Sequence, residues 1–529
     1  MRKVKRRVLI LMCCILGALI LFPVEEKVRG VIALRSWEAQ ARATGVPLTV
    51  EDALLIFQSN RPATRLSPQQ IQDRIPWAPM RSSHPSAMRM CAPGKARIVW
   101  KETKWRETDD LTNTWASIKP LSEEEEDRLA QARSDMAAGL FTANLDYKLG
   151  FNIMLPHLAT LKGLANTFTT HVLTKLREKD LNAVQQDLLA MAALTDRMQG
   201  ERLVICQLVR SAIGQISLAV LWEALQAEGW TDEQLASIQA AWSSQTFLSG
   251  MADALEMERI MIRDRLRTTS MSVGELRSAL SMASVPGLTR SGDNGRPGVG
   301  LVGEGILQPL SDATETLRAQ IFLVWWRFAW MEQDHLHGQK LLMAKVDAGR
   351  AAAREGNWRE KSGLDGRSED EEMLVGLMET RATNPKESTY DRVRFWLSSL
   401  SQASLLGAET KAAQEDAFRQ LAVTVVAIER YRLRHQKLPA SLADLVPDLL
   451  PAPPLDVMDA KPLRYRPGTN GTFLLYSVGK NGRDDGGDGR STTPGNVSSY
   501  STFGKDIVWP MPASPEEIQA ADARRFGRR

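Results

Sequence analysis

The sequence predicts a mainly α-helical protein with an N-terminal transmembrane helix, a large body of helical hairpins and a small α+β domain near its C-terminus. Three observations predict this fold class. An unbroken apolar run occupies residues 8–24. Apolar side chains then recur at helical spacing in long stretches between 122 and 435. Short strand-like runs, separated by Pro, Gly and Asp, begin only after residue 438.

The apolar run predicts a membrane anchor. A span over about residues 7–24 is just long enough to cross a bilayer. Arg6 and Arg7 precede the run and Glu25-Glu26 follow it, which places the N-terminus in the cytoplasm. We therefore expect a single-pass protein of the cell inner membrane with an extracytoplasmic, periplasmic body.

Other interpretations of the apolar run remain open. A cleaved signal peptide needs small residues at its cleavage site, whereas bulky Phe22-Pro23-Val24 ends this run. Lipid attachment at Cys13 or Cys14 is a second alternative, but Met12 occupies the position where a small residue is expected. A cytoplasmic chain is the third alternative.

The charge distribution argues against a nucleic-acid partner. The formal net charge is +4, but Arg2, Lys3, Lys5, Arg6 and Arg7 contribute five positive charges, which leaves the remainder near −1. A nucleic-acid-binding domain usually carries a basic patch. The expected partners are the membrane, through residues 7–24, and proteins that the sequence does not identify.

Helix-start signals divide the body into hairpins. Ser122 followed by Glu125, and Thr231 followed by Gln234, are capping boxes, and short breaks between helices favour antiparallel packing. We expect Leu161, Phe168, Leu188, Leu208 and Leu221 to be buried. A helical solenoid would look similar, but we find no fixed repeat.

The predicted segments follow from these signals and from changes in composition. They are a basic tip and anchor (1–29), a mixed juxtamembrane region (30–121), a helical body (122–282), a Gly/Pro loop (283–310), further helical body with a charged linker at 355–372 (311–407), an α+β domain (408–510) and a basic tail (511–529). A disulfide between Cys91 and Cys206 stays open, because sequence alone does not decide it.

Three motifs suggest chemistry but fit ordinary structure better. Gly298-x-Gly300-x-x-Gly303 has the spacing of a dinucleotide fingerprint but lacks the preceding strand, which predicts a loop. Glu332, Asp334, His335 and His337 form a cluster that could hold a metal in an enzymatic site, although a solvated helix end explains it more simply. The aromatic helix at 322–330 predicts a core element, with a membrane-interface helix as the alternative.

The Gly/Asp-rich loop at 479–506 is the candidate cation site. Asn481, Asp484, Asp485 and Asp506 offer oxygen ligands, and the intervening glycines let carbonyl groups turn inward. Calcium takes six to eight oxygens in flexible geometry. The competing interpretation is a solvated acidic turn.

The C-terminal 90 residues or so resemble the soluble head of the type II secretion major pseudopilin. The ordered markers are Tyr431, Leu438-Pro439, the 442–447 helix, Pro454-Leu455-Asp456, Pro462 with Tyr465, the 475–479 strand, Asn481-Gly482 and Asp506-Ile507. This resemblance implies calcium bound through the positions of Asn481 and Asp506, with Asp484 or Asp485 as substitutes for the missing charge at Asn481. The N-terminus departs from a pseudopilin, because basic residues adjoin the apolar run directly.

The whole chain also resembles large membrane-anchored proteins of planctomycete and verrucomicrobial bacteria that end in such a module. This resemblance is general and implies no activity. The single apolar segment, the helical stripes and the absence of a catalytic motif predict a non-enzymatic structural or protein-interaction scaffold with a pseudopilin-like cap. The alternatives are a component associated with a secretion system, and an enzyme with a metal site in the helical body.

Overall fold

The structure is a computed structural model that describes residues 2–57, 65–76, 85–106, 112–115, 122–268, 322, 324–362, 389–490 and 505–526. For residues 2–20 it describes the backbone alone. Of the residues that the structure describes, 66% are helical and 8% lie in strands, which confirms the predicted mainly α class. The predicted Gly/Pro loop at 283–310 and the Gly298, Gly300 and Gly303 motif lie outside the described residues.

The chain folds as two compact units, and each unit is assembled from separate parts of the sequence. Unit 1 comprises Met1–Ser59, Leu255–Val346 and Arg367–Gly407. Unit 2 comprises Asn60–Ala254, Asp347–Gly366 and Ala408–Arg529. Neither unit is therefore a contiguous stretch of sequence.

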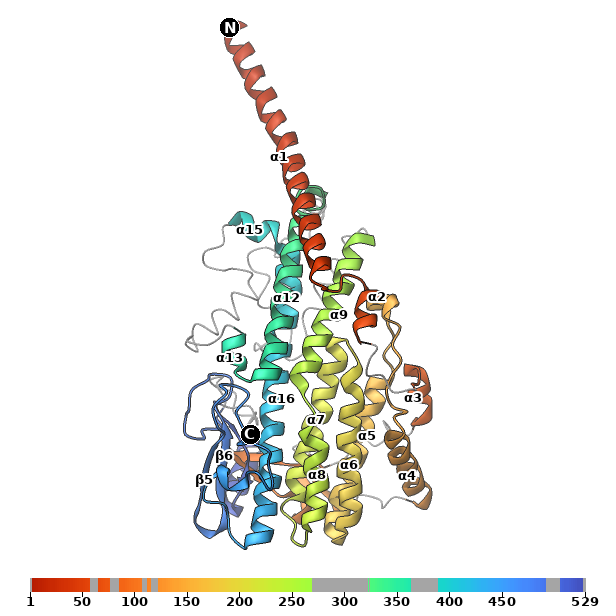
Figure 1. Ribbon diagram of the computed structural model, residues 1–529, viewed down its shortest axis with the longest axis vertical. Helices are drawn as coiled ribbons and strands as arrows, with labels where there is room; N and C mark the ends of the chain where they lie inside the picture. Colours follow the sequence, from red (N-terminus) through yellow and green to blue (C-terminus); the bar gives the residue numbers. More distant parts are fainter. Residues whose placement is uncertain are drawn as a thin grey trace. The chain divides into compact units, whose positions relative to one another are not determined.

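Unit 1 is built on a single long N-terminal helix, α1 (Figure 1). Its other helical parts are α2 (Val50–Phe57), a short helix at 324–329, α15 (Thr389–Arg394) and the parts of α9 (Phe247–Thr268), α12 (Met331–Glu355) and α16 (Trp396–His435) that fall within its residues. Helix α1 runs from Arg2 to Ala43 and buries Glu26, Gly30 and Glu38. A Cβ at Gly30 would lie 2.8 Å from Cγ of Gln333, so glycine allows α1 and α12 to pack closely.

Buried arginines connect the remaining parts of unit 1. Arg263 in α9 donates to the Glu38 carboxylate at 2.8 Å and to the Leu48 carbonyl at 3.0 Å. Arg259 donates to the carbonyl of Pro47 at 2.6 Å and to Oε1 of Gln339 at 2.8 Å. Because buried charged groups need such partners, these bonds hold α1, the loop after it, α9 and α12 together.

The helical part of unit 2 consists of hairpins, as the sequence predicts. Its helices are α3 (Pro68–Arg74), α4 (Glu123–Ala137), η5 (Tyr147–Asn152), α5 (His157–Glu178), α6 (Leu181–Arg197), η6 (Met198–Gly200), α7 (Val204–Ala224), α8 (Asp232–Ser243) and the start of α9. Helices α5, α6 and α7 pack against one another. The capping boxes at Ser122 and Thr231 are confirmed.

The predicted core of this unit is confirmed at four positions and wrong at one. Leu161, Phe168, Leu188 and Leu221 are buried. Leu208 is only half-buried. It lies between the buried Gln207 and Arg210 on α7, and polar side chains take the inward positions there because they are fully hydrogen-bonded.

Three small sheets belong to unit 2. The first is β1 (Arg89–Ala92), β2 (Lys95–Arg97) and β8 (Met511–Pro512), with β2 parallel to β8 and Lys95 paired with Met511. The second is the β3 (Lys104–Arg106) and β4 (Thr112–Thr114) hairpin. The third is antiparallel and joins β5 (Arg464–Pro467), β6 (Phe473–Ser477) and β7 (Ile507–Val508), with Ser477 opposite Ile507.

Short helices complete the unit. They are η3 (Val99–Lys101), α13 (Trp358–Lys361), η7 (Leu442–Leu445), η8 (Thr469–Gly471) and α17 (Pro515–Phe526). Helix α17 lies where the sequence predicts a basic tail, and it contacts β1 through the bond from Arg524 to the Cys91 carbonyl. The predicted boundary at residue 408 falls inside the continuous helix α16. Cys91 and Cys206 are separate buried thiols.

One helix among the described residues, Val204–Ala224, is long and apolar enough to cross a membrane. It buries Gln207, Arg210 and Glu223 and packs against α5 and α6, as a core helix does. The predicted span at 7–24 falls in α1, where the side chains before residue 21 lie outside the described part. The anchor therefore stays a prediction.

Candidate functional site

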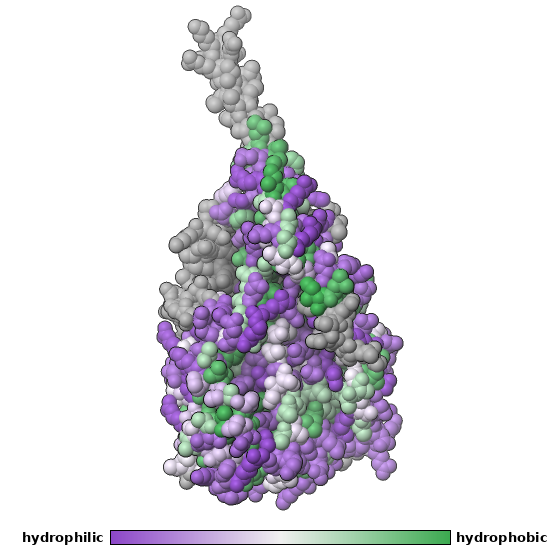
Figure 2. Space-filling model, in the orientation of Figure 1, coloured by the Kyte–Doolittle hydropathy of each residue, from purple (hydrophilic) through white to green (hydrophobic). Residues whose placement is uncertain are grey.

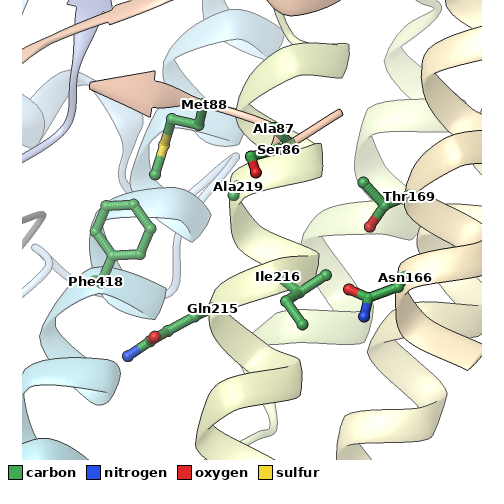
Figure 3. A pocket seen from close by; sticks show the side chains of 9 residues that line it. All are labelled: Ser86, Ala87, Met88, Asn166, Thr169, Gln215, Ile216, Ala219 and Phe418. Atoms are coloured by element: carbon green, nitrogen blue, oxygen red, sulfur yellow. The ribbon is translucent and has the colours of Figure 1, made fainter. Parts of the chain in front are cut away.

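Unit 2 contains a cavity of about 270 Å³ between α5, α7 and α16 (Figure 3). A segment that leads into β1 forms another part of its wall. The lining residues are Ser86, Ala87, Met88, Asn166, Thr169, Gln215, Ile216, Ala219 and Phe418. The volume is close to the lower limit for small-molecule sites in proteins, about 300 Å³.

One side of the cavity is apolar. Figure 3 shows Met88 above the ring of Phe418, with Ala219 of α7 beside Met88 and the apolar side chain of Ile216 nearer to Asn166. Phe418 is held in place because its ring stacks on Trp509, with ring centroids 5.4 Å apart. This side can bury an apolar part of a ligand.

The opposite side is polar. Asn166 and Thr169 come from successive turns of α5 (Figure 3). The Thr169 hydroxyl donates to the carbonyl of Ala165 at 3.0 Å. The Asn166 side-chain amide has no hydrogen-bond partner among the described residues, and it therefore offers a ligand both a donor and an acceptor.

Gln215 connects the cavity wall to a buried carboxyl group. Its amide donates to Glu415, which is fully buried in α16. Burial raises the pKa of Glu415 to about 8, so this group is mostly neutral at pH 7. Its Oε2 has no partner among the described residues.

A second buried carboxyl group fixes the position of Met88. Glu223 of α7 accepts the N–H of Met88 at 2.9 Å and the N–H of Val99 at 3.1 Å. Burial raises the pKa of Glu223 to about 8. The backbone of Met88 has φ of +48°, a left-handed conformation that is uncommon for a residue other than glycine. The hydrogen bond to Glu223 helps to hold it.

The chemistry of this cavity fits binding of a small neutral molecule. Its lining combines apolar side chains with the amides of Asn166 and Gln215. The described lining residues include no histidine, cysteine or carboxylate that could serve as a base beside the hydroxyls of Ser86 and Thr169.

The predicted calcium ligands are brought into one loop, but Asp506 is occupied by N–H groups. Its carboxylate accepts the N–H of Gly487 at 2.7 Å, of Asp488 at 3.1 Å and of Asp485 at 3.4 Å. Gly486 and Gly487 have positive φ, which lets successive N–H groups converge on one acceptor. Burial raises the pKa of Asp506 to about 6.

Of the other three predicted ligands, two contact each other and the third contacts a tyrosine. Asn481 donates from its amide to Asp485 at 2.7 Å. Asp484 accepts from the hydroxyl of Tyr476 at 2.7 Å. The described residues contain no group of three His, Cys, Asp or Glu side chains placed to hold a metal ion, and residues 491–504 of this loop lie outside them. As arranged, the loop fits calcium only in part.

The predicted cluster at 332–337 lies at the start of α12, and three of its four side chains contact other parts of unit 1. Glu332 pairs with Lys27 at 2.5 Å, and Asp334 accepts the N–H of Ser398 at 3.0 Å. His335 is buried, which lowers its pKa to about 4, and His337 contacts the Ser398 hydroxyl at 3.0 Å. The simpler interpretation, a solvated helix end, is wrong for Asp334 and His335.

The predicted core role of the aromatic helix is confirmed within unit 1. Trp326, Ala329 and Trp330 form a buried cluster, against which Leu266 and Leu397 pack. The indole of Trp326 donates to Asp334 at 2.9 Å.

Sequence reasoning missed a buried polar network on the α5–α6 hairpin. The ring of His171 contacts Asp187 through Nδ1 and Glu126 through Nε2, and Arg133 donates to the same Asp187 at 2.8 Å. His171 and Asp187 lie eight positions before and after Lys179, where the hairpin turns. Counting outward from the predicted turn could therefore have paired them.

Comparison of the chain with protein-family models, with curated proteins and with solved structures gives no match. The resemblance of the C-terminal region to a pseudopilin head therefore stays a prediction.

Proposed function

We propose that this chain is a membrane-anchored, extracytoplasmic scaffold that works by binding other molecules. The observation that carries the proposal is the continuity of α1. One helix extends from the basic tip through the apolar residues 8–24 and continues to Ala43, and beyond the apolar run it buries Glu26, Gly30 and Glu38 within unit 1. A membrane segment that continues as a packed helix holds the protein at the membrane without a flexible linker.

The side-chain contacts of α1 beyond the apolar run support this arrangement. Gln333 donates to the carbonyl of Glu26 at 2.6 Å, and Lys27 pairs with Glu332. The proposed location is the inner membrane with a periplasmic body, because the basic residues precede the apolar run.

The C-terminal region is proposed as a pseudopilin-like cap that contacts other proteins. Several features support this proposal: the end of α16, the short η7 helix, the antiparallel β5–β6–β7 sheet and the loop that Asp506 closes. Asp456 is fully buried and accepts the N–H of Val478 at 2.9 Å and the Ser477 hydroxyl at 2.7 Å. An association with a secretion system would appear as copurification with its components from solubilised membranes.

Calcium is the cation proposed for the Gly/Asp-rich loop at 479–506, which is called the cap loop below. Asp485 and Asp506 would supply carboxylate oxygens, and the ion would offset the charge that Asp485 imposes on the buried Asp506. Binding requires Asp506 to release at least one of its N–H contacts. We therefore expect weak binding, with Kd of about 0.1–1 mM, as in extracellular calcium modules.

A reporter experiment tests the anchor. Alkaline phosphatase fused after residue 60 should be active, because that enzyme folds only outside the cytoplasm, and a cytoplasmic reporter fused at the same place should be inactive. The reverse pattern, or release of the full-length chain from membranes by alkaline extraction, would overturn the proposal.

The cavity favours a second role, the binding of a small, neutral and largely apolar molecule. Ligand binding raises stability with the ratio of ligand concentration to Kd. We would screen neutral amphiphiles by thermal unfolding of the full-length chain, and compare it with Ala219→Phe, which fills the cavity from its lining. A stabilising ligand whose effect persists in Ala219→Phe would contradict this assignment.

A further inference from the structure

The short helix at 324–329 in unit 1 has one buried face and one exposed face. Trp326 and Ala329 belong to the core cluster. Val324 and Phe328 are 69% and 51% exposed, and Arg327 is exposed between them. Positions i, i+3 and i+4 share one face of a helix, so two apolar side chains and a cation form a single surface.

Hydrogen bonds within unit 1 connect this helix to α1 at the end of its apolar run. The Trp330 indole donates to the hydroxyl of Tyr390 at 3.2 Å, and this hydroxyl donates to the Glu26 carboxylate at 2.9 Å. The ring of Tyr390 also meets that of Phe22 edge-on, with centroids 6.4 Å apart. The helix at 324–329 is thus held beside residues 22–26, where the predicted span ends.

Helix α1 continues the same kind of surface. Leu21, Val24, Val28 and Ile32 are all exposed and recur every three or four residues, which places them along one side of the helix. Figure 2 shows hydrophobic side chains gathered on this stretch of α1, in contrast to the mostly hydrophilic surface around them.

The composition of this surface is that of a membrane interface. A helix that lies in the membrane interface carries large apolar side chains such as Phe or Leu on one face, with Arg or Lys beside them. The exposed face here has Val324 and Phe328 with Arg327. Arg327 forms no ion pair with the described residues. An arginine beside apolar side chains can extend toward lipid phosphates while its neighbours insert.

We infer that the exposed face formed by Val324, Arg327 and Phe328 lies in the headgroup region of the bilayer beside α1. This inference rests on the proposed anchor, since α1 sets the level of the helix relative to the membrane. The surface would fix the tilt of unit 1 by giving it a second point of lipid contact besides α1.

Depth-dependent quenching tests the inference on the full-length chain. Cys13 and Cys14 are replaced by Ala, while the buried Cys91 and Cys206 remain. An environment-sensitive fluorophore is then attached in three separate variants, Phe328→Cys, Leu21→Cys and Gln40→Cys. Each is reconstituted in vesicles of phosphatidylethanolamine and phosphatidylglycerol with spin-labelled lipid, the label lying either near the headgroup or at mid-chain.

The three positions separate this inference from the anchor. Gln40 is exposed and lies 16 residues beyond Val24, about 24 Å along the helix, so it should not be quenched. We expect Phe328→Cys to show blue-shifted emission and about twofold stronger quenching by the shallow label than Gln40→Cys. If Leu21→Cys is quenched but Phe328→Cys behaves like Gln40→Cys, the anchor stands and the inference falls. If Leu21→Cys is not quenched, both fall.

A matched variant separates lipid contact from folding. Val324→Ser with Phe328→Ser changes only exposed side chains, so the melting temperature in detergent should not change. In vesicles, the same double change should reduce the quenching of a fluorophore at Arg327→Cys. Unchanged quenching at that site would contradict insertion of this face.

Discussion

Glu223 accepts a hydrogen bond from the backbone N–H of Met88 at 2.9 Å, although 135 positions separate the two residues. The same carboxyl group accepts the N–H of Val99. Helix α7 thus fixes both ends of the segment that contains β1 and β2, and with it one wall of the cavity.

Removing this acceptor should destabilise the protein. Glu223→Ala leaves the N–H groups of Met88 and Val99 without a partner, and we expect a loss of about 2–4 kcal/mol of unfolding free energy. Glu223→Gln keeps an acceptor oxygen of similar size and should cost less. Urea unfolding at pH 7 measures both, and an equal loss in the two variants would contradict the hydrogen-bond explanation.

The pH dependence of the same group has a definite sign. The pKa of Glu223 is raised from 4.5 to about 8, so the folded protein holds a proton that the unfolded chain has lost between these values. This contribution to stability is present below pH 4.5 and decreases as the pH rises toward 8. The difference in stability between the wild-type chain and Glu223→Gln should therefore shift in favour of the variant over that range.

Phe168 tests the packing of the α5–α6–α7 core. It is fully buried, and the centroid of its ring lies 5.9 Å from the guanidinium carbon of Arg133. Phe168→Ala should cost about 3–5 kcal/mol, because it leaves a cavity in a packed core. Leu208→Ala is the control, since its half-buried side chain should cost less. A loss below about 1 kcal/mol at Phe168 would be incompatible with its burial.

The carboxylate of Asp416 in α16 binds the free N–H groups at the N-terminus of α9. It accepts the N–H of Phe247 at 3.0 Å and that of Leu248 at 2.8 Å. Asp416→Ala should cost about 1–3 kcal/mol, since the first N–H groups of a helix have no partner within it. Hydrogen exchange at Phe247 and Leu248 should accelerate more than exchange in α5. Uniform acceleration would indicate global destabilisation instead.

Asp506 tests whether the cap loop depends on calcium. Asp506→Ala should lower stability without metal by about 2–4 kcal/mol, because three N–H groups lose their acceptor. If calcium binds, the wild-type chain should gain about 2.7 kcal/mol at a hundredfold excess over Kd. Asn481→Asp should enlarge that gain, because it adds a negative charge. With Kd of about 0.1–1 mM, that excess corresponds to about 10–100 mM calcium. Identical melting curves at this calcium concentration and with chelator would leave the loop as an acidic turn closed by N–H groups.

The experiment needs the full-length chain, because the cap packs on other parts of unit 2. The Trp222 indole donates to the Pro510 carbonyl at 2.7 Å, and Gln239 donates to the Leu449 carbonyl at 2.7 Å. A fragment beginning at residue 408 would lose both partners.

Local signals predicted the helices well, because their determinants lie within a few residues. A capping box such as those at Ser122 and Thr231 is recognised from one residue and the residue three positions after it. The pairing of Lys95 with Met511 has no local determinant, and nothing near Lys95 in the sequence indicates it. The same applies to Glu223, whose acidic side chain would ordinarily be expected at the surface of a helix.

The candidate sites also divide into one that local sequence indicates and one that depends on the tertiary fold. The residues of the cap loop were found from composition, since Gly and Asp at close spacing are visible in the sequence. The cavity was not, because its walls come from Met88, Asn166, Gln215 and Phe418, which only the tertiary fold brings together.

The parallel pairing of β2 with β8 has a consequence for biosynthesis. Lys95 leaves the ribosome 416 positions before Met511. At about 5–20 residues per second, translation separates these partners by roughly 20–80 s. During that interval the outer edge of β2 has no strand to pair with, and unpaired edges promote aggregation. We therefore expect the nascent chain to need a holding chaperone, and faster translation through residues 97–511 to reduce that need.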